Sequence, residues 1–426
     1  MIELEIMNQE DREKEKKEII EQTAQFVRNN VKKLELYYGN ADGGKRNGYI
    51  KSISMKEYIE YLVKVSVVIL TANEYEENIL NYYAHNSQKN AAENPILEVD
   101  RKVTFKTKKI SFNAYILKID KYYVLHLHAQ NTGSYTIGGS ADMVRYVAEN
   151  EYLHPTCIIS FGICFGHDHT KQELGDTIIA KTLYPYFIGA KLSDGTLTVK
   201  SHDFILNLSD TSNELYETLE KLKKNKIIDV DQTDIECNVD MGNLITGEAV
   251  LSDGIYKKIF EDAAHAIDPK GGEMEGYGMG KECLFYNIPC LLIKSICDWG
   301  SEKNIDKEIN EMTHISNTKD KIQAYTSYCA YTVLKKLFNE RIFEESLYEK
   351  YKNKLHQKAK IGNGCFVPSS EIVNEFKNYN DLLDNTETYK MVTSNYRKKF
   401  CEIMIKDGVW EASSNSNGYT FKEKGV

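Results

Sequence analysis

Residues 288–296 form a largely apolar segment in which Lys294 is the one charged residue. Such a run is typical of a strand that is buried on both faces of a sheet. Two carboxylates bracket this part of the chain, Glu275 ahead of a predicted helix and Asp298 just beyond the strand. Open α/β sheets bind their ligands beyond the carboxyl ends of their strands. The pattern therefore predicts a functional role for Asp298.

Strand-like and helix-like segments alternate over the middle of the chain. A strand, a turn and a helix are predicted over residues 66–81. The other predicted strands cover residues 109–119, 122–128, 156–162, 176–181 and 243–248. Helices are predicted over residues 139–150 and 319–338. Strands that alternate with helices predict an α/β sheet with helices packed against it.

Residues 8–38 predict a long, charged helix at the amino-terminal end. Its apolar stripe consists of Ile20, Ala24, Val27, Val31 and Leu34. This spacing fits a heptad seam, but barely two heptads are present, which is too few to establish a coiled coil. The stripe can equally pack against its own domain, and the sequence leaves both alternatives open.

A glycine-rich segment, GNADGGKR over residues 39–46, follows this helix and matches most of a phosphate-binding loop. A true phosphate-binding loop follows a strand and ends in Ser or Thr, which binds magnesium. Here a helix precedes the segment and Arg46 stands in the place of that hydroxyl. A surface loop is therefore favoured.

The last part of the chain predicts a small separate domain. Helices near residues 369–377 and 387–406 precede two short aromatic strands joined by a Ser-Asn-Gly turn, which indicates a winged-helix-like domain. The basic run at 397–399 is more typical of a solvated face than of a phosphate contact. A protein partner or self-association is favoured over nucleic acid. The predicted domains are residues 1–63 (a helical extension), 64–338 and 339–426.

Composition limits the class of protein further. The 426 residues carry a net charge of -9, which argues against a nucleic-acid-binding surface. No apolar run of about eighteen residues predicts a membrane span, and the first residues lack a signal-peptide pattern. The nine cysteines include no CxxC pair and fit buried thiols in a reducing cytoplasm. The run His167-Asp168-His169 lacks an evident third ligand, so neither a metal nor another cofactor is predicted.

Four motifs occur in order along the chain: ILTANEYE (69–76), SFGICFG with LGD (160–176), TGEAVL (246–251) and GEMEG with CDW (272–299). Together they resemble the purine nucleoside phosphorylase/uridine phosphorylase superfamily, and within it the methylthioadenosine/S-adenosylhomocysteine nucleosidases most. The resemblance covers about residues 64–338. It implies a three-layer fold in which helices flank a central, mixed, twisted sheet.

The resemblance also implies a reaction and three acidic roles. Breaking an N-ribosidic bond places positive charge on the ribose and negative charge on the departing base, so an acid with a raised pKa assists by protonating the purine. A second, ionised carboxylate can activate water, and a third can hold the ribose hydroxyls. By resemblance these are Asp298, Glu76 and Glu275, in that order. Structural alternatives are a helix cap for Asp298 and a helix-dipole acid for Glu76 and Glu275.

Further contacts follow from the same resemblance. Met274 would pack against the ribose, and Val250 and Leu251 would hold the base. Gly162 and Ile163 lie in the first glycine motif, where a glycine allows a close approach of the backbone to the ligand. Lys294 stands where the compared nucleosidases carry an arginine near the water. A lysine keeps the positive charge of that arginine but lacks its planar, forked guanidinium group.

The acceptor is predicted to be water. Phosphorylases of the family carry an R-x-G-S motif, whereas residues 160–163 here read SFGI and lack both anion-binding side chains. A phosphate-dependent phosphorylase and a non-catalytic nucleotide sensor remain as alternatives. The substrate is predicted to be a purine nucleoside or nucleotide, with adenine favoured, and a homo-oligomer is expected. Similar cores fused to accessory domains deplete nucleotides in bacterial anti-phage defence, which is an analogy at the level of the fold.

Overall fold

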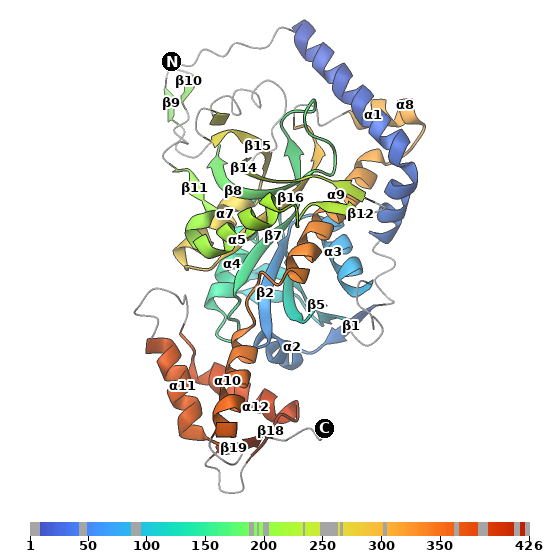
Figure 1. Ribbon diagram of the computed structural model, residues 1–426. Helices are drawn as coiled ribbons and strands as arrows, with labels where there is room; N and C mark the ends of the chain where they lie inside the picture. Colours follow the sequence, from blue (N-terminus) through green and yellow to red (C-terminus); the bar gives the residue numbers. More distant parts are fainter. Residues whose placement is uncertain are drawn as a thin grey trace.

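The computed structural model describes residues 9–41, 49–86, 95–186, 191–193, 196–198, 204–232, 235–247, 263–264, 267–300, 305–361, 366–381, 391–412 and 418–421. Within these ranges, a mixed sheet of twelve strands forms the centre of the molecule (Figure 1). Its strands are β1 (Ile50–Ile53), β2 (Val65–Thr71), β3 (Ile96–Val99), β4 (Val103–Phe105), β5 (Thr107–Ile119), β6 (Tyr122–His128), β7 (Cys157–Gly166), β8 (Thr177–Pro185), β11 (Leu206–Asn207), β14 (Val239–Thr246), β15 (Pro269–Glu273) and β16 (Cys290–Asp298).

The strand order is β1-β3-β5-β6-β2-β7-β15-β14-β8-β11, with β4 beside β5 and β16 paired with both β7 and β8. Strands β2, β7 and β16 lie parallel and adjacent, with Val68 opposite Ile158 and Ile158 opposite Cys290. All seven residues of β2 are buried. These are the apolar runs that the sequence predicts as interior strands, and their carboxyl ends reach the same edge of the sheet.

Helices cover both faces of this sheet. The main ones are α1 (Gln9–Asn40), α2 (Met55–Leu62), α3 (Glu74–Asn86), α4 (Ser140–Glu149), α5 (Asn213–Lys224), α7 (Gly276–Phe285), α8 (Asp306–Thr313) and α9 (Thr318–Asn339). Helix α9 packs on β7 and β16 and is flanked by α3 and α1, whereas α7 packs on the same strands with α4 beside it. Figure 1 shows these two groups on opposite sides of the sheet. The predicted three-layer α/β fold is confirmed.

Helix α1 packs against its own chain. Ala24, Val27 and Leu34 of the predicted stripe are at most 1% exposed, and α1 contacts α8 and α9. Polar contacts support this packing: Glu35 forms an ion pair of 2.6 Å with Lys321 of α9. The sequence left two alternatives open for this helix, and the structure shows the second: α1 packs against its own domain.

The central sheet begins earlier than residue 64. Strand β1 pairs in parallel with β3 at the edge of the sheet, in a region where the sequence indicated only helix. Two of its four residues are exposed, so the strand carries a weak apolar pattern that does not stand out in the sequence. Residues 42–46, which are most of the glycine-rich segment, lie outside the described residues. The three domain boundaries stay predictions.

The carboxyl-terminal elements follow in the order α10 (Leu347–Ile361), β17 (Phe366–Pro368), α11 (Ser369–Asp381), α12 (Ser394–Lys406), β18 (Trp410–Ala412) and β19 (Gly418–Phe421). The three strands form an antiparallel sheet in the order β17-β19-β18. This is the arrangement of a winged helix, as predicted. Helix α12 begins at Ser394, later than the predicted start at 387, because the Thr393 hydroxyl caps it by accepting a hydrogen bond from the Tyr396 amide at 3.1 Å.

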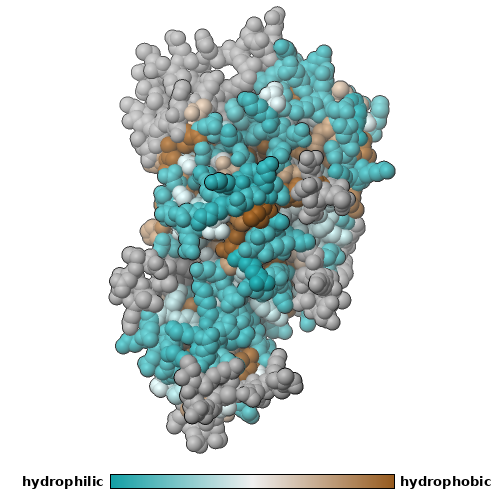
Figure 2. Space-filling model, in the orientation of Figure 1, coloured by the Kyte–Doolittle hydropathy of each residue, from teal (hydrophilic) through white to brown (hydrophobic). Residues whose placement is uncertain are grey.

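This winged-helix portion has an apolar core of its own, which includes Tyr351, Phe376, Phe400 and Trp410. It contacts the rest of the chain below the sheet, where Lys64 and Asp407 form an ion pair of 2.5 Å (Figure 1). The face of the molecule in Figure 2 is mostly hydrophilic and carries only small apolar patches. Among the described helices, none has the length and apolar character that crossing a membrane requires.

Candidate functional site

Glu76 lies at the start of α3, directly after the carboxyl end of β2. Its side chain folds back over the first turn, and its Oε2 atom accepts hydrogen bonds from the amides of Ala72 (2.9 Å) and Asn73 (3.0 Å). The Asn73 side chain in turn accepts a bond from the Tyr75 amide at 2.7 Å. A short polar residue ahead of a helix and an acid three residues later are typical of a helix start. This explains how the local sequence fixes the Glu76 carboxylate in space.

The neighbouring strand β7 holds the other oxygen of Glu76. The amide of Ile163 donates to Oε1 at 2.9 Å. Gly162 has a φ of +151°, and a Cβ atom there would lie 1.9 Å from the same oxygen. Only a glycine fits this position, because it tolerates this positive φ and because it has no Cβ atom that would clash with the carboxylate. At Gly162 the backbone therefore lies close to Glu76, and the approach to a ligand that the sequence suggested there stays a prediction.

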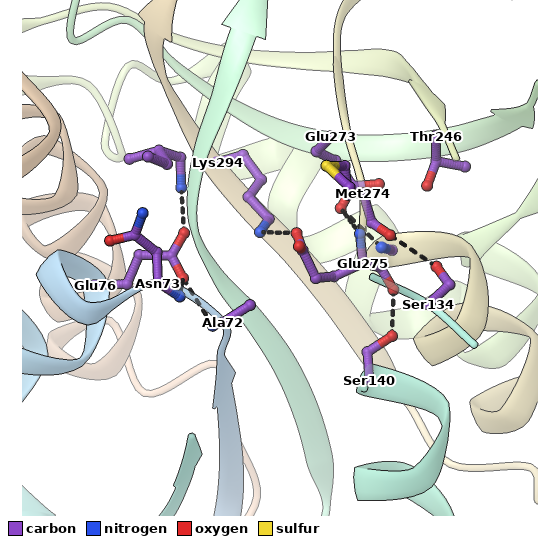
Figure 3. Close-up of polar contacts among 12 residues, drawn as sticks. Ala72, Asn73, Glu76, Ser134, Ser140, Thr246, Glu273, Met274, Glu275 and Lys294 are labelled. Atoms are coloured by element: carbon purple, nitrogen blue, oxygen red, sulfur yellow. Dashed lines mark hydrogen bonds and ion pairs between the residues drawn. The ribbon is translucent and has the colours of Figure 1, made fainter. Parts of the chain in front are cut away.

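Lys294 of β16 lies between Glu76 and Glu275 (Figure 3). It stands opposite Gly162 in the register of β16 and β7. Its side chain is 1% exposed, and its Nζ atom lies 3.2 Å from the Oε2 atom of Glu275. The lysine is therefore the buried cation that links the acid on α3 with the acid ahead of α7.

Met274 and Glu275 lie in the short segment between β15 and α7. Two serines from distant parts of the chain hold the main chain of this segment (Figure 3). The Ser134 hydroxyl donates to the Met274 carbonyl at 3.0 Å and accepts from the Gly278 amide at 3.0 Å. The Ser140 hydroxyl donates to the Glu275 carbonyl at 2.5 Å. These serines come from the loop after β6 and the first turn of α4, and no motif in the sequence indicates them.

Burial and neighbouring charges shift the pKa values of this group. Burial raises the pKa of Glu76, the positive charge of Lys294 opposes this rise, and Glu275 adds to it. Burial alone would lower the pKa of Lys294, but the charges of Glu275, Glu76 and Glu273 outweigh it and raise the pKa above its usual value. Lys294 is therefore held as an ammonium ion in a site rich in carboxylates.

Asp298 is the last residue of β16, four positions beyond Lys294. It is half-buried, and its Oδ1 atom accepts a hydrogen bond from the Gly300 amide at 2.9 Å. At the rise of a strand, the Cα atoms of Lys294 and Asp298 are about 13 Å apart. Asp306 of α8 is a nearby acid that the sequence analysis missed; burial raises its pKa, Lys319 opposes this, and the charge of Asp298 adds to it.

The loop with His167, Asp168 and His169 is packed between α1 and the end of β16. The side-chain amide of Gln22 donates to the His169 carbonyl at 2.7 Å, and the His169 ring lies edge-on to Trp299. Asp168 accepts hydrogen bonds from Lys171 and from Thr170, which lower its pKa to about 2. Among the described residues, no group of three or more His, Cys, Asp or Glu side chains is arranged to hold a metal ion.

The structure thus brings together most of the residues that the sequence singled out. Glu76, Gly162, Ile163, Lys294, Glu275 and Met274 form one connected network at the carboxyl edge of β2, β7 and β16. Asp298 lies at the end of the same central strand. Val250 and Leu251 lie outside the described residues. The roles assigned to all these residues stay predictions.

No protein-family model matches the chain. The Death domain-containing ATP nucleosidase of Amphimedon queenslandica is 26% identical over 168 residues, which cover 37% of this chain and 31% of that protein. The chain therefore matches about a third of that relative's length. The relative is itself a nucleosidase, which confirms the resemblance predicted from the four motifs.

Solved structures of similar proteins come from several bacteria. The 5′-methylthioadenosine/S-adenosylhomocysteine nucleosidase of Helicobacter pylori has a TM-score of 0.44 and 12% identity, over 65% of this chain and 99% of that chain. The same enzyme from Neisseria meningitidis has a TM-score of 0.41 and 14% identity, over 65% and 99% of the two chains. The futalosine hydrolase of Helicobacter pylori has a TM-score of 0.42 and 14% identity, over 65% and 98%.

Proposed function

We propose that this protein is a purine nucleosidase, which hydrolyses the N-ribosidic bond of a purine nucleoside or nucleotide. The observation that carries this proposal is the buried network of Glu76, Lys294 and Glu275, which lies at the edge of the sheet where β16 ends in Asp298. Two carboxylates held on either side of one buried ammonium suit a reaction in which positive charge develops on a ribose.

Each acid has a separate role in the proposed reaction. Asp298 donates a proton to the purine, so that the base departs as a neutral molecule. Glu76, fixed by three main-chain amides, accepts a proton from the attacking water. Glu275 binds the ribose hydroxyls, and Lys294 supplies the positive charge that Glu275 and Glu76 face. The main-chain bonds from Ser134 and Ser140 hold the ribose-binding segment in place.

Water is the proposed acceptor. Phosphorolysis needs donors that surround a dianion, and the only charged donor of the network, Lys294, is already engaged with Glu275 at 3.2 Å. Ile163 offers its amide to Glu76 and places an apolar side chain where an anion-binding serine would be needed. These features support hydrolysis over the phosphorylase alternative.

We further propose adenine as the base and ATP as one of the substrates. The support is the name of the relative, an ATP nucleosidase, which is similar over part of this chain. The eight described cysteines are free thiols, which fits action in the cytoplasm. A role in anti-phage defence would follow from nucleotide depletion and stays a hypothesis by analogy.

A homo-oligomer is the proposed assembly. Tyr135, Leu284 and Phe285 are exposed to 43%, 41% and 78%. They lie on one surface, because the Nζ atom of Lys281, on the same helix as Leu284 and Phe285, lies 5.8 Å from the centroid of the Tyr135 ring. Large apolar side chains that gather on a surface are typical of a contact between protein chains. A protein partner for the winged-helix portion stays a prediction.

The proposal is tested by incubating the full-length protein with adenosine, methylthioadenosine, AMP, ATP or NAD, each with and without phosphate. Free base is followed by chromatography. We expect adenine release from at least one substrate at a rate independent of phosphate. Release that depends on phosphate would indicate a phosphorylase instead, and no release from any of the five substrates would contradict the proposed activity.

A further inference from the structure

Glu273 is a buried acid for which the proposed mechanism has no use. It is the last residue of β15 and is 3% exposed. Its Oε2 atom accepts hydrogen bonds from the amides of Glu275 (2.8 Å) and Gly276 (2.7 Å), where α7 begins. Its Oε1 atom is buried and has no hydrogen-bond partner among the described residues. A negative charge on an unsatisfied buried oxygen is strongly unfavourable.

The charges around Lys294 do not balance if every acid is ionised. Glu76, Glu273 and Glu275 all act on the single ammonium of Lys294. Two buried carboxylates and a third that is 13% exposed, beside one buried cation, leave two negative charges without a counter-ion. Like charges in such a site favour protonation of one of them.

The hydrogen bonds indicate which acid carries the proton. Both oxygens of Glu76 accept main-chain amides. Glu275 faces the ammonium of Lys294 at 3.2 Å. Of these three acids, Glu273 is the one with a buried oxygen that lacks a hydrogen-bond partner among the described residues, and a proton on that oxygen would need only an acceptor. Thr246 of β14 lies beside Glu273 and carries a hydroxyl oxygen (Figure 3).

We propose that Glu273 is a positioning residue that carries a proton on Oε1 near neutral pH and so leaves the charge of Lys294 to Glu275 and Glu76. In this state Glu273 still holds the start of α7 through Oε2, and Oε1 donates to the Thr246 hydroxyl. Lys294 is then not drawn toward a third carboxylate. The role of protonated Glu273 in catalysis rests on the function proposed above. The protonation of Glu273 does not depend on that function.

The other groups that face Glu273 agree with this state. Burial raises the pKa of Glu273; Lys294 of β16 opposes the rise, Glu275 adds to it, and the Thr246 hydroxyl and the Glu275 amide oppose it. Another titratable neighbour is Cys164 of β7, whose pKa is also raised by burial. Cys164 is therefore a neutral thiol and supplies no charge that could stabilise an ionised Glu273.

Infrared difference spectroscopy of the substrate-free protein tests the protonation. Near pH 7, the spectrum of wild type minus that of Glu273→Gln should show the C=O band of a protonated carboxylic acid. The matched control is Glu275→Gln: the spectrum of wild type minus that of this variant should lack the C=O band that is assigned to Glu273. Loss of carboxylate bands in Glu273→Gln would overturn the proposal. Because no substrate is present, this result does not depend on whether the protein is a nucleosidase.

Activity measurements on Glu273→Gln and Glu273→Leu separate a positioning role of Glu273 from simple support of the fold. Glu273→Gln keeps an acceptor and a neutral head group, so kcat/KM should stay within about threefold of wild type, whereas Glu275→Gln should lose about tenfold or more. Glu273→Leu removes the acceptor for α7 and should lose activity. If Glu273→Gln does not fold, Thr246→Val provides the test, since it should shift the carboxylic-acid band. An unshifted band in Thr246→Val, or equal losses in Glu273→Gln and Glu273→Leu, would overturn the proposal.

Discussion

Lys294 and Glu275 form an ion pair of 3.2 Å in which the two side chains are only 1% and 13% exposed. Strand β16 supplies the lysine, and the segment ahead of α7 supplies the acid. A pair this far out of water is sensitive to removal of either partner, because the remaining charge is left without compensation. The pair joins the strand that ends in Asp298 to the segment that we propose binds the ribose.

Replacement of Lys294 by methionine should reduce both activity and stability. The variant leaves Glu275 and Glu76 without their cation, so we expect kcat/KM to fall about 100-fold and the free energy of unfolding to fall by about 3–5 kcal/mol. Lys294→Arg keeps the positive charge on a side chain of different shape. Its kcat/KM and its free energy of unfolding should therefore lie between those of wild type and the methionine variant. Steady-state kinetics and urea denaturation measure these effects. A fully active methionine variant would show that the cation has no part in the reaction.

Gly162→Ala should affect activity far more than an ordinary glycine substitution. The new Cβ atom would lie 1.9 Å from Glu76 Oε1 and would displace the carboxylate. Gly408→Ala is the matched control, because Gly408 also has a positive φ, of +70°, but has no atom within 4 Å of the added Cβ. The control should cost about 1 kcal/mol of stability and leave kcat unchanged.

The comparison of these two alanine variants uses thermal unfolding and kcat/KM. We expect Gly162→Ala to lose most of its activity, since Glu76 must move, while Gly408→Ala keeps it. Equal activity in the two variants would mean that the position of Glu76 does not matter for the reaction.

Ser140→Ala should weaken substrate binding more than it lowers stability. The hydroxyl donates to the Glu275 carbonyl at 2.5 Å, and its loss frees the segment that carries Glu275. One lost hydrogen bond of this kind corresponds to about 1 kcal/mol, or a KM about fivefold higher. Ser212→Ala, which removes the cap of α5, is the control and should lower stability with KM unchanged. A KM that rises equally in both variants would contradict a local role for Ser140.

The pH dependence of the reaction should report the raised pKa of Glu76. As the proposed base, Glu76 must be ionised, so kcat/KM should rise with pH along a limb that lies above the ordinary glutamate value of about 4.3. Burial causes this shift, and Lys294 opposes it. The sign for stability is opposite: the folded state holds the proton more tightly, so the contribution of Glu76 falls as pH rises above the unfolded value.

The matched control for this profile is Glu77→Gln. Glu77 is also buried in α3, where it accepts a hydrogen bond from the Tyr115 hydroxyl at 2.6 Å, but it faces away from the network. Its variant should keep the acidic limb, whereas Glu76→Gln should lose activity across the range. An acidic limb at or below the ordinary glutamate value would contradict the role of Glu76.

The sequence predicted the parts of the fold that have strong apolar patterns. Strands β2, β7 and β16 and helix α9 are buried on most sides and therefore stand out. Strand β1 did not, because it lies at an edge and half of it is exposed. Pattern also could not decide how α1 packs, since a stripe of apolar residues shows that a face is covered but not by what.

For the site, the motifs predicted Glu76, Lys294, Glu275 and Asp298 as residues, but not the bonds between them. Ser134 and Ser140 act through hydroxyls that reach main-chain carbonyls over 130 residues away in the sequence. Serines in loops are common and carry no distinctive pattern. Likewise, the fact that Glu273 supports α7 while Glu275 faces Lys294 depends on local backbone geometry that the letters GEMEG do not contain.

The most direct test of the proposed function is adenine release from ATP in water labelled with oxygen-18, for wild type and Asp298→Asn. The variant removes the proposed acid while keeping the shape of the side chain, and a general acid contributes about 100-fold or more to such a reaction. Mass spectrometry of the products should show free adenine and one labelled oxygen on the ribose product for wild type, and little of either for Asp298→Asn. Equal release by the two proteins, or no release by wild type, would contradict the account.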